Sequence, residues 1–377
     1  MKDIIKYIKY YLSTILIIFT ILFCSNGANY PTFCFIIFSV LIMGGDLLFK
    51  EDLSVFKIAN RRLINMPIYI NFSLLLIFLT EIIFLLGNYE ASWIINIFNN
   101  YFKIDLLQLK AEITFIDRIS LIALGALYIG IIGTVPGHEL THRKKDKIDM
   151  FFGNWLLSIS WDCAFALEHV YGHHKYVGLP NDPATAKRKE NIYMFTIRAT
   201  FREHIDAWKI ELNHLDRRGY RIFGFHNKMI IGYLRSGIIT YLFWIIGGNL
   251  GMFIYLLCAL IAKFLLEAIN YIEHYGLVRE PNKPVYPRHS WNSNHLISSL
   301  LLYNVTRHSA HHEKSNLQFW ELEPYSKAPK MPYGYLTMLY MVIFLPFLFH
   351  KIMKKKLDDW DKNFASESER EIILNQK

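Results

Sequence analysis

The chain has 377 residues, of which 53% are hydrophobic, and 41 Lys and Arg against 32 Asp and Glu give it a formal net charge of +9. This composition is too apolar for an ordinary soluble domain and indicates one membrane unit rather than two soluble domains. A basic excess is typical of membrane-protein loops, and no basic, aromatic-interleaved soluble face indicates nucleic-acid binding.

Six segments are long and apolar enough to cross a bilayer, which takes about 20 such residues. The first two are joined by a polar turn and the last two by a glycine-rich turn, so each pair is expected to form a helical hairpin. The N-terminus resembles a secretory signal, but further spans follow it, and we expect an uncleaved anchor. The segments are 11–27, 32–49, 67–87, 119–136, 230–247 and 252–270.

The loop charges predict the orientation, because Lys and Arg collect on the cytoplasmic side. They cluster before the first segment, after the second and after the fourth, whereas the two hairpin turns have none. The loop after the third segment, with Lys103, Lys110 and Arg118, fits least well. We therefore expect four spans in residues 1–136, a cytoplasmic segment over 137–229, two spans in 230–270, and a second cytoplasmic segment over 271–377.

Three further segments are harder to place. Residues 151–167 are apolar but short, which favours a re-entrant or buried helix. Residues 333–350 follow Pro332 and end in a basic cluster, so a seventh span would put that cluster on the outer face. We expect this segment to dip into the membrane or to lie along it. Residues 358–377 are charged and are expected to form a frayed, solvated tail.

Nine of the 15 histidines lie in four short motifs beside the apolar segments. Imidazole is a strong ligand for iron, zinc and copper, and residues four apart on a helix share a face. The two histidines of HELTH can therefore bind one ion. His169 and His173 repeat that spacing, and His174 should point about a quarter-turn away. The predicted metal ligands are His138, His142, His169, His173, His174, His274, His308, His311 and His312.

Nine imidazoles exceed the about four to six ligands that one first-row ion takes, so the motifs predict two metals. A closed zinc site would use four ligands, often cysteine, and the four cysteines here form no C-x-x-C pair. Open positions on the ions would make them catalytic. Neighbouring side chains would orient the ligands from outside, and the candidates are Glu139, Glu168, Asp182, Glu273 and His295.

An ionisable side chain inside a membrane segment indicates function by default. Lys263 and Glu267 lie four apart in the sixth segment, on much the same stripe as Asn270 and His274. Two interpretations stay open: a structural ion pair, or support for the part of the site that carries His274. A metal transporter would instead place ligands at mid-bilayer along a pathway, whereas these histidines follow the ends of spans.

The motifs HELTH, EHVYGHH, NYIEHYGL and RHSAHH, in this order and with WNSNH between the last two, resemble those of the integral-membrane alkane 1-monooxygenases. These enzymes belong to a histidine-box superfamily that includes fatty acid desaturases. The element NYIEHYG separates them from the desaturases, and xylene monooxygenases share much of the pattern. The resemblance extends from about residue 47 to residue 360.

The resemblance implies an all-α membrane protein with six transmembrane helices and a cytoplasmic histidine-rich catalytic cap, placed in the bacterial inner membrane. It implies two non-haem iron ions held by the nine histidines. The implied reaction is hydroxylation of the terminal carbon of a medium- or long-chain alkane by O2. The apolar substrate would arrive from the bilayer, and the electrons from a rubredoxin and its reductase.

Related enzymes acting on fatty acyl chains, as desaturases or hydroxylases, or on alkyl-aromatics such as xylene remain the alternative. The sequence also departs from the family pattern at two places. The family usually has Asp where Ala310 stands, and a basic, proline-containing stretch where residues 313–320 read EKSNLQFW. The electron donor therefore need not be a standard rubredoxin.

Overall fold

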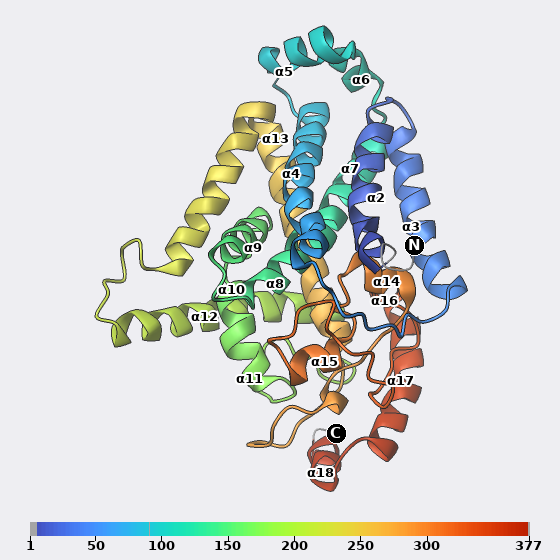
Figure 1. Cartoon of the computed structure of the whole chain (residues 1–377), viewed down its shortest axis with the longest axis vertical. Helices are drawn as coiled ribbons and strands as arrows, with labels where there is room; N and C mark the ends of the chain where they lie inside the picture. The colour runs from blue at the N-terminus through green and yellow to red at the C-terminus, as the bar shows by residue number, and fades with distance from the viewer. Residues whose placement is uncertain (1–5, 90, 376–377) are drawn as a thin grey trace.

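The computed structural model describes residues 6–89 and 91–375, and these residues form helices and no strand. Long helices run roughly side by side through the upper half of the molecule in Figure 1, and shorter helices gather around their lower end. Lys2, one of the basic residues of the expected N-terminal anchor, lies outside the described residues. The all-helical fold class predicted from the sequence is confirmed.

Five helical stretches among the described residues are long and apolar enough to cross a membrane. Side chains such as Leu22, Phe33 and Val40 are exposed along them, as expected for helices that face lipid. The protein is therefore an integral membrane protein. The five stretches are Lys6–Cys24, which contains η1 (Lys9–Tyr11) and α2 (Leu12–Cys24), α3 (Tyr30–Leu48), α4 (Arg61–Leu86), Phe115–Thr141, and α13 (Lys228–His274).

The expected number of six separate spans differs from these five stretches because α13 contains both of the last two segments. Its backbone bends sharply at Gly248, which has φ 65° and ψ −161°. This conformation is open essentially to glycine alone. The bend lets the two halves of α13 run as the arms of a hairpin, and the second half ends at His274.

The stretch Phe115–Thr141 is one continuous rod made of three pieces. It begins as α7 (Phe115–Tyr128), widens into the π-helix η3 (Ile129–Thr134) and ends as α8 (Val135–Thr141). Its first turn is capped by Thr114 and Asp117, which hydrogen-bond each other's backbone. Asp117 also accepts from the hydroxyl of Thr32, 2.5 Å away. These bonds fix the rod against the α2–α3 hairpin.

The segments between the spans form short helices at both ends of the bundle. At one end, drawn at the top of Figure 1, the described residues form the short helices α5 (Ser92–Ile97), η2 (Phe98–Phe102) and α6 (Leu106–Glu112). At the other end α12 lies across the bundle. The helices of that end are α9 (Lys147–Ile159), α10 (Phe165–Glu168), η4 (His169–His173), α11 (His174–Tyr176), α12 (Ile192–Arg217), η5 (Pro287–His289), α14 (Leu296–Leu301) and α15 (His308–Glu313).

Residues 151–167 do not form a single helix. They include most of α9, a break, and the start of α10, and the inner face of α9 is buried. Residues 333–350 are also divided, because Pro346 has no N–H to donate and begins a new helix. The pieces are α16 (Tyr335–Phe344) and α17 (Pro346–Asn363). The 10 residues of α16 measure about 15 Å, which is too short to span a bilayer.

The prediction of a frayed C-terminal tail is wrong. The chain continues through α17 into α18 (Glu367–Asn375), and Trp360, Glu369 and Ile373 are buried. Most of the charges that suggested a solvated tail lie on the outer faces of these two helices, but Glu369 is buried. Their inner faces pack on the molecule, and α18 also binds it through the Glu369 carboxylate.

Candidate metal centre

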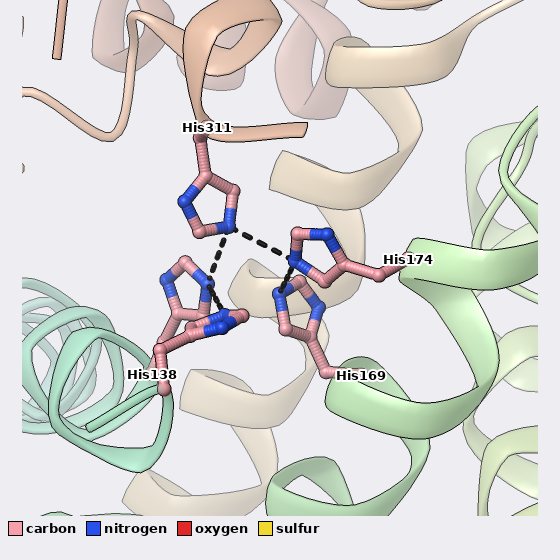
Figure 2. Close-up of side chains that lie close together, drawn as sticks. His138, His169, His174 and His311 are labelled. Carbon is pink, nitrogen blue, oxygen red and sulfur yellow. Dashed lines mark hydrogen bonds between the residues drawn. The ribbon is translucent and has the colours of Figure 1, made fainter. Parts of the chain in front are cut away.

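The nine histidines predicted as ligands converge at one end of the bundle, where they form two groups. Within each group the ring nitrogens lie within 4.8 Å of one another. Figure 2 shows His138, His169, His174 and His311 pointing toward one another, with His169 and His174 on one segment and His138 and His311 on two others. The first group is His138, His142, His169, His174 and His311, and the second is His173, His274, His308 and His312.

The spacing in the first group is that of ligands around one ion. The Nε2 atom of His138 lies 3.1 Å from those of His142 and His311. The Nε2 atom of His174 likewise lies 3.1 Å from those of His169 and His311. Two nitrogens at right angles around one ion, each about 2.1 Å from it, are separated by about 3.0 Å. The donor set therefore fits a single metal ion.

The second group has the same spacing, and one of its Nε2 atoms is buried without a hydrogen-bond partner among the described residues. The Nε2 atom of His308 lies 3.1 Å from that of His274 and 2.9 Å from that of His312. The Nε2 atom of His173 is buried and has no hydrogen-bond partner among the described residues. A buried nitrogen without a partner is unfavourable, and a metal ion would satisfy it. These four rings therefore fit a second ion.

Glu273 lies closer to this second group than expected. Its Oε2 atom is 3.3 Å from Nε2 of His308, and its Oε1 atom is buried without a hydrogen-bond partner. The sequence predicted it as a side chain that orients a ligand. Its position instead brings the carboxylate within direct reach of an ion bound by His308.

The second histidine motif folds differently from the expected α-helix. η4 is a π-helical turn over His169–His173, and a π-turn aligns residues five apart rather than four. His169 therefore shares the first group with His174, and His173 turns toward the second group. The expected shared face of His169 and His173 was wrong, but the divergence of His173 from His174 is real.

The third histidine motif lies between the two groups on α15. His308 and His312 are four residues apart and both face the second group, whereas His311 faces the first. HELTH behaves as its spacing predicts, because His138 and His142 share the first group. The π-turn η3 ends at Thr134, just before the helix α8 that carries His138 of HELTH. Single π-turns within helices are frequent at functional sites.

Two ligand rings are held from outside through their Nδ1 atoms. His173 donates to Asp182, whose two oxygens lie 3.0 and 3.1 Å away, and Asp182 also accepts from Thr185 and the Ala184 N–H. His274 donates to the backbone carbonyl of His289 at 3.1 Å. Each bond orients the ring and leaves the lone pair on Nε2 free to bind a metal ion. The candidate Asp182 thus lies where the sequence placed it.

The support of His274 continues to the C-terminus through residues that sequence reasoning missed. The His289 ring lies 2.8 Å from Glu369, and Arg288 donates to the same carboxylate at 3.0 Å. His289 was expected to be an ordinary histidine. No spacing signal connects it with Glu369, which lies 80 residues further along the chain.

The other three candidates do not hydrogen-bond through their side chains to any of the nine histidines within the described chain. Glu139 accepts from Arg143 at 2.7 Å and from the Phe319 N–H, so it fixes the loop after α15. Glu168 packs over Gly172. The His295 ring pairs with Ser293 at 3.0 Å, and its backbone bridges to Glu51. The expectation that His295 supports the ligands was wrong.

Burial favours the neutral form of several rings outside the membrane segments. Burial, followed by the charge of neighbouring imidazoles, lowers the pKa of His142, His169 and His312 well below the ordinary value. For His311 the pKa falls to about 3. Burial would raise the pKa of Asp182, but His173, the Thr185 hydroxyl and His274 together outweigh burial and lower it. At neutral pH these four rings are therefore neutral and the Asp182 carboxylate is ionised, which suits metal binding.

Comparison with known proteins places this arrangement in a family. A family model for fatty acid desaturases matches residues 117–341, which is more than half of the chain and contains all nine histidines. Alkane 1-monooxygenase 2 of Alcanivorax borkumensis is 37% identical over 234 residues, 61% of each chain. The alkane 1-monooxygenase of Ectopseudomonas oleovorans is 35% identical over 67% of this chain and 65% of its own.

The chain is also similar to an enzyme component that is named for a different substrate. The hydroxylase component of a xylene/toluene monooxygenase of Pseudomonas putida is 34% identical over 67% of this chain and 68% of its own. The chain spans about three fifths of the length of the first of these alkane 1-monooxygenases. With its family match and these relatives, the chain belongs to the fatty acid desaturase family and resembles the alkane 1-monooxygenases.

Proposed function

We propose that this protein is a membrane monooxygenase that hydroxylates the terminal carbon of medium- or long-chain alkanes with O2. The observation that carries the proposal is the pair of adjacent histidine groups, in which nine rings and one carboxylate converge at the end of the membrane bundle. The names of the curated relatives support alkanes as the substrate class. The reaction, its substrate and its partners are proposals for this chain.

The proposed cofactor is a pair of iron ions, one in each histidine group. His138, His142, His169, His174 and His311 would hold the first, and His173, His274, His308 and His312, with Glu273 beside them, the second. Iron in such a site supplies the redox chemistry that activates O2 to attack a C–H bond, which zinc does not have. Asp182 and the His289 carbonyl would keep the rings of His173 and His274 oriented.

An apolar cavity supports entry of an apolar substrate from the lipid. The cavity measures about 150 Å³ and lies among α3, α7, α13 and α16, with Leu127, Phe264 and Ile343 in its walls. The rod that begins with α7 ends in HELTH, and α13 ends in His274. We infer that an alkane enters between these helices and follows them toward the histidine groups.

A basic pocket supports docking of an acidic electron donor such as a rubredoxin. The pocket measures about 890 Å³ and is lined by Lys187, Lys189 and Arg202, among other residues. Asp182 is part of the same wall and binds His173, so the pocket reaches the second group through one side chain. We propose that electrons enter on this side, which would face the cytoplasm.

A product profile tests the proposal. Membranes containing the protein, a rubredoxin and its reductase would be supplied with n-alkanes of graded length, xylene and a fatty acyl ester. Primary alcohols from the alkanes, absent in His312→Ala, are expected. Benzylic alcohols or olefins without alkanols would contradict the alkane assignment and favour the xylene or fatty acyl alternative. Xylene is included because one relative is named a xylene/toluene monooxygenase component.

A further inference from the structure

A second polar cluster lies buried beside the candidate metal centre, outside the two histidine groups. Lys263 on α13 is 2.9 Å from Asp162, 2.9 Å from Glu203 on α12 and 2.5 Å from Glu267 on its own helix. All four residues are buried, with at most 6% of their surface exposed. We call Asp162, Glu203, Lys263 and Glu267 the Lys263 cluster.

The charges of the Lys263 cluster do not balance. One ammonium offsets one carboxylate, and two further buried carboxylate charges would be strongly unfavourable. The imbalance is relieved if carboxyl groups in the cluster share protons.

Two carboxyl groups show where such protons would lie. Oδ1 of Asp162 is buried and has no hydrogen-bond partner in the described part of the chain. Burial, followed by the charge of Glu267, raises the pKa of Glu203 well above its ordinary value. A purely structural ion pair would need only one of the three carboxylates.

The Lys263 cluster shares α13 with His274 of the candidate metal centre, and it interacts through Glu168 with a solvent-open pocket. Asn270 donates to Glu267 at 3.2 Å, and Glu267 precedes His274 by two helical turns, or about 10 Å. A pocket of about 600 Å³ reaches Glu168, which interacts electrostatically with Glu267 and Lys263. Glu168 of α10 interacts electrostatically with Glu203 as well, and Asp206 of α12 acts on Glu168. Cys163 faces Asp162 and Lys263, and Tyr233 of α13 faces Asp162.

We propose that the Lys263 cluster is a proton store that supplies protons to the histidine groups during O2 reduction. This inference rests on the proposed function. In that reaction one oxygen atom enters a C–H bond and the other leaves as water, which consumes two electrons from the one-electron donor protein and two protons. A site that excludes bulk water to protect the reaction needs an internal source for those protons.

The first test detects the stored protons without any metal or substrate. Metal-free wild-type protein is transferred from H2O to D2O, and infrared difference spectra are recorded in the region of the protonated carboxyl C=O stretch. We expect a deuterium-sensitive band that is reduced or lost in Glu203→Gln and in Glu267→Gln. Glu190→Gln is the matched control, because Glu190 is paired with Arg198 at 2.8 Å and should carry no proton. Absence of the band from wild type, or its survival in both cluster variants, would overturn the inference.

The second test connects the proton store to turnover. Iron-loaded Glu203→Gln and Glu267→Gln should keep their iron and their KM, lose about tenfold or more in kcat, and show a larger solvent deuterium isotope effect than wild type or Glu190→Gln. Loss of iron in both variants would make the cluster a structural clamp and overturn the inference, as would unchanged kcat. If wild type itself forms no alkanol, the proposed function fails, and that failure is separate because the infrared band does not depend on substrate.

Discussion

His169 and His174 are five positions apart in the sequence, yet their Nε2 atoms lie 3.1 Å from each other. The π-turn η4 produces this contact, because it adds one residue to a helical turn. It also releases His173 to the second group. Both halves of the candidate centre therefore depend on the conformation of one short turn.

Gly172→Ala should disturb that turn. A Cβ at this position would collide with the buried carboxylate of Glu168, which packs over the glycine. Overpacking of this kind destabilises a protein by about 1–3 kcal/mol. We expect lower iron content and a lower Tm, both measured on purified protein. Gly224→Ala is the control, since an added Cβ there has only a distant backbone neighbour, and equal effects in the two variants would contradict the role given to η4.

His311→Ala and His312→Ala should affect different ions although the residues are adjacent. His311 belongs to the first group and His312 to the second. We expect each variant to retain part of the iron of wild type and to change different parts of the iron spectrum by Mössbauer spectroscopy. His226→Ala, whose ring is exposed and stacked on Tyr220, is the control. Identical spectra for the two variants would argue against two separate groups.

Asp182→Ala should weaken metal binding without removing a ligand. The carboxylate accepts the Nδ1–H of His173 and fixes that ring. Loss of such an outer partner typically lowers metal affinity about 10- to 100-fold. Competition with a chelator would measure the change, and Asp359→Ala, on the exposed face of α17, is the control. An unchanged affinity would show that His173 needs no such support.

Acid should release the C-terminal helix α18. Burial would raise the pKa of Glu369, but its hydrogen bonds with His289 and Arg288 outweigh burial and lower the pKa to about 2. Because the folded value lies below the ordinary 4.5, the stabilisation is complete above pH 4.5 and is lost as the pH falls toward 2. Hydrogen exchange of α18 should therefore speed up over this range, beyond the change caused by pH alone.

The variant Glu369→Gln provides the comparison for this pH dependence. It removes the titrating carboxylate, so α18 should already exchange faster at neutral pH, and the acid-induced acceleration should be lost. Since the His289 carbonyl binds His274, a fall in iron affinity should accompany the loosening. If α18 exchanges at the wild-type rate at neutral pH, the contact between Glu369 and His289 does not hold the tail.

The sequence predicted those parts of the structure that follow regular periods. Hydropathy located the spanning segments, and the four-residue spacing placed His138 with His142 and His308 with His312. The same rule failed at His169, because nothing in EHVYGHH distinguishes a π-turn from an α-turn before the structure is known. The bend at Gly248 was visible only as a glycine-rich turn, which does not tell whether a helix ends there or bends.

Long-range partners lay beyond what the sequence could predict. Lys263 and Glu267 were recognisable as a pair because they share one helix, but Asp162 and Glu203 come from other elements. The contact between His289 and Glu369 joins α18 to η5, which precedes the third histidine motif. The charges of the tail suggested solvation because composition does not reveal which face of a helix is buried.

Metal analysis of the purified protein tests the central claim most directly. We predict two iron ions per chain, measured by plasma mass spectrometry, because each histidine group has the spacing of ligands around one ion. The iron should remain through gel filtration, and zinc should be nearly absent. One ion per chain, or zinc in place of iron, would contradict the two-iron centre and the monooxygenase chemistry built on it.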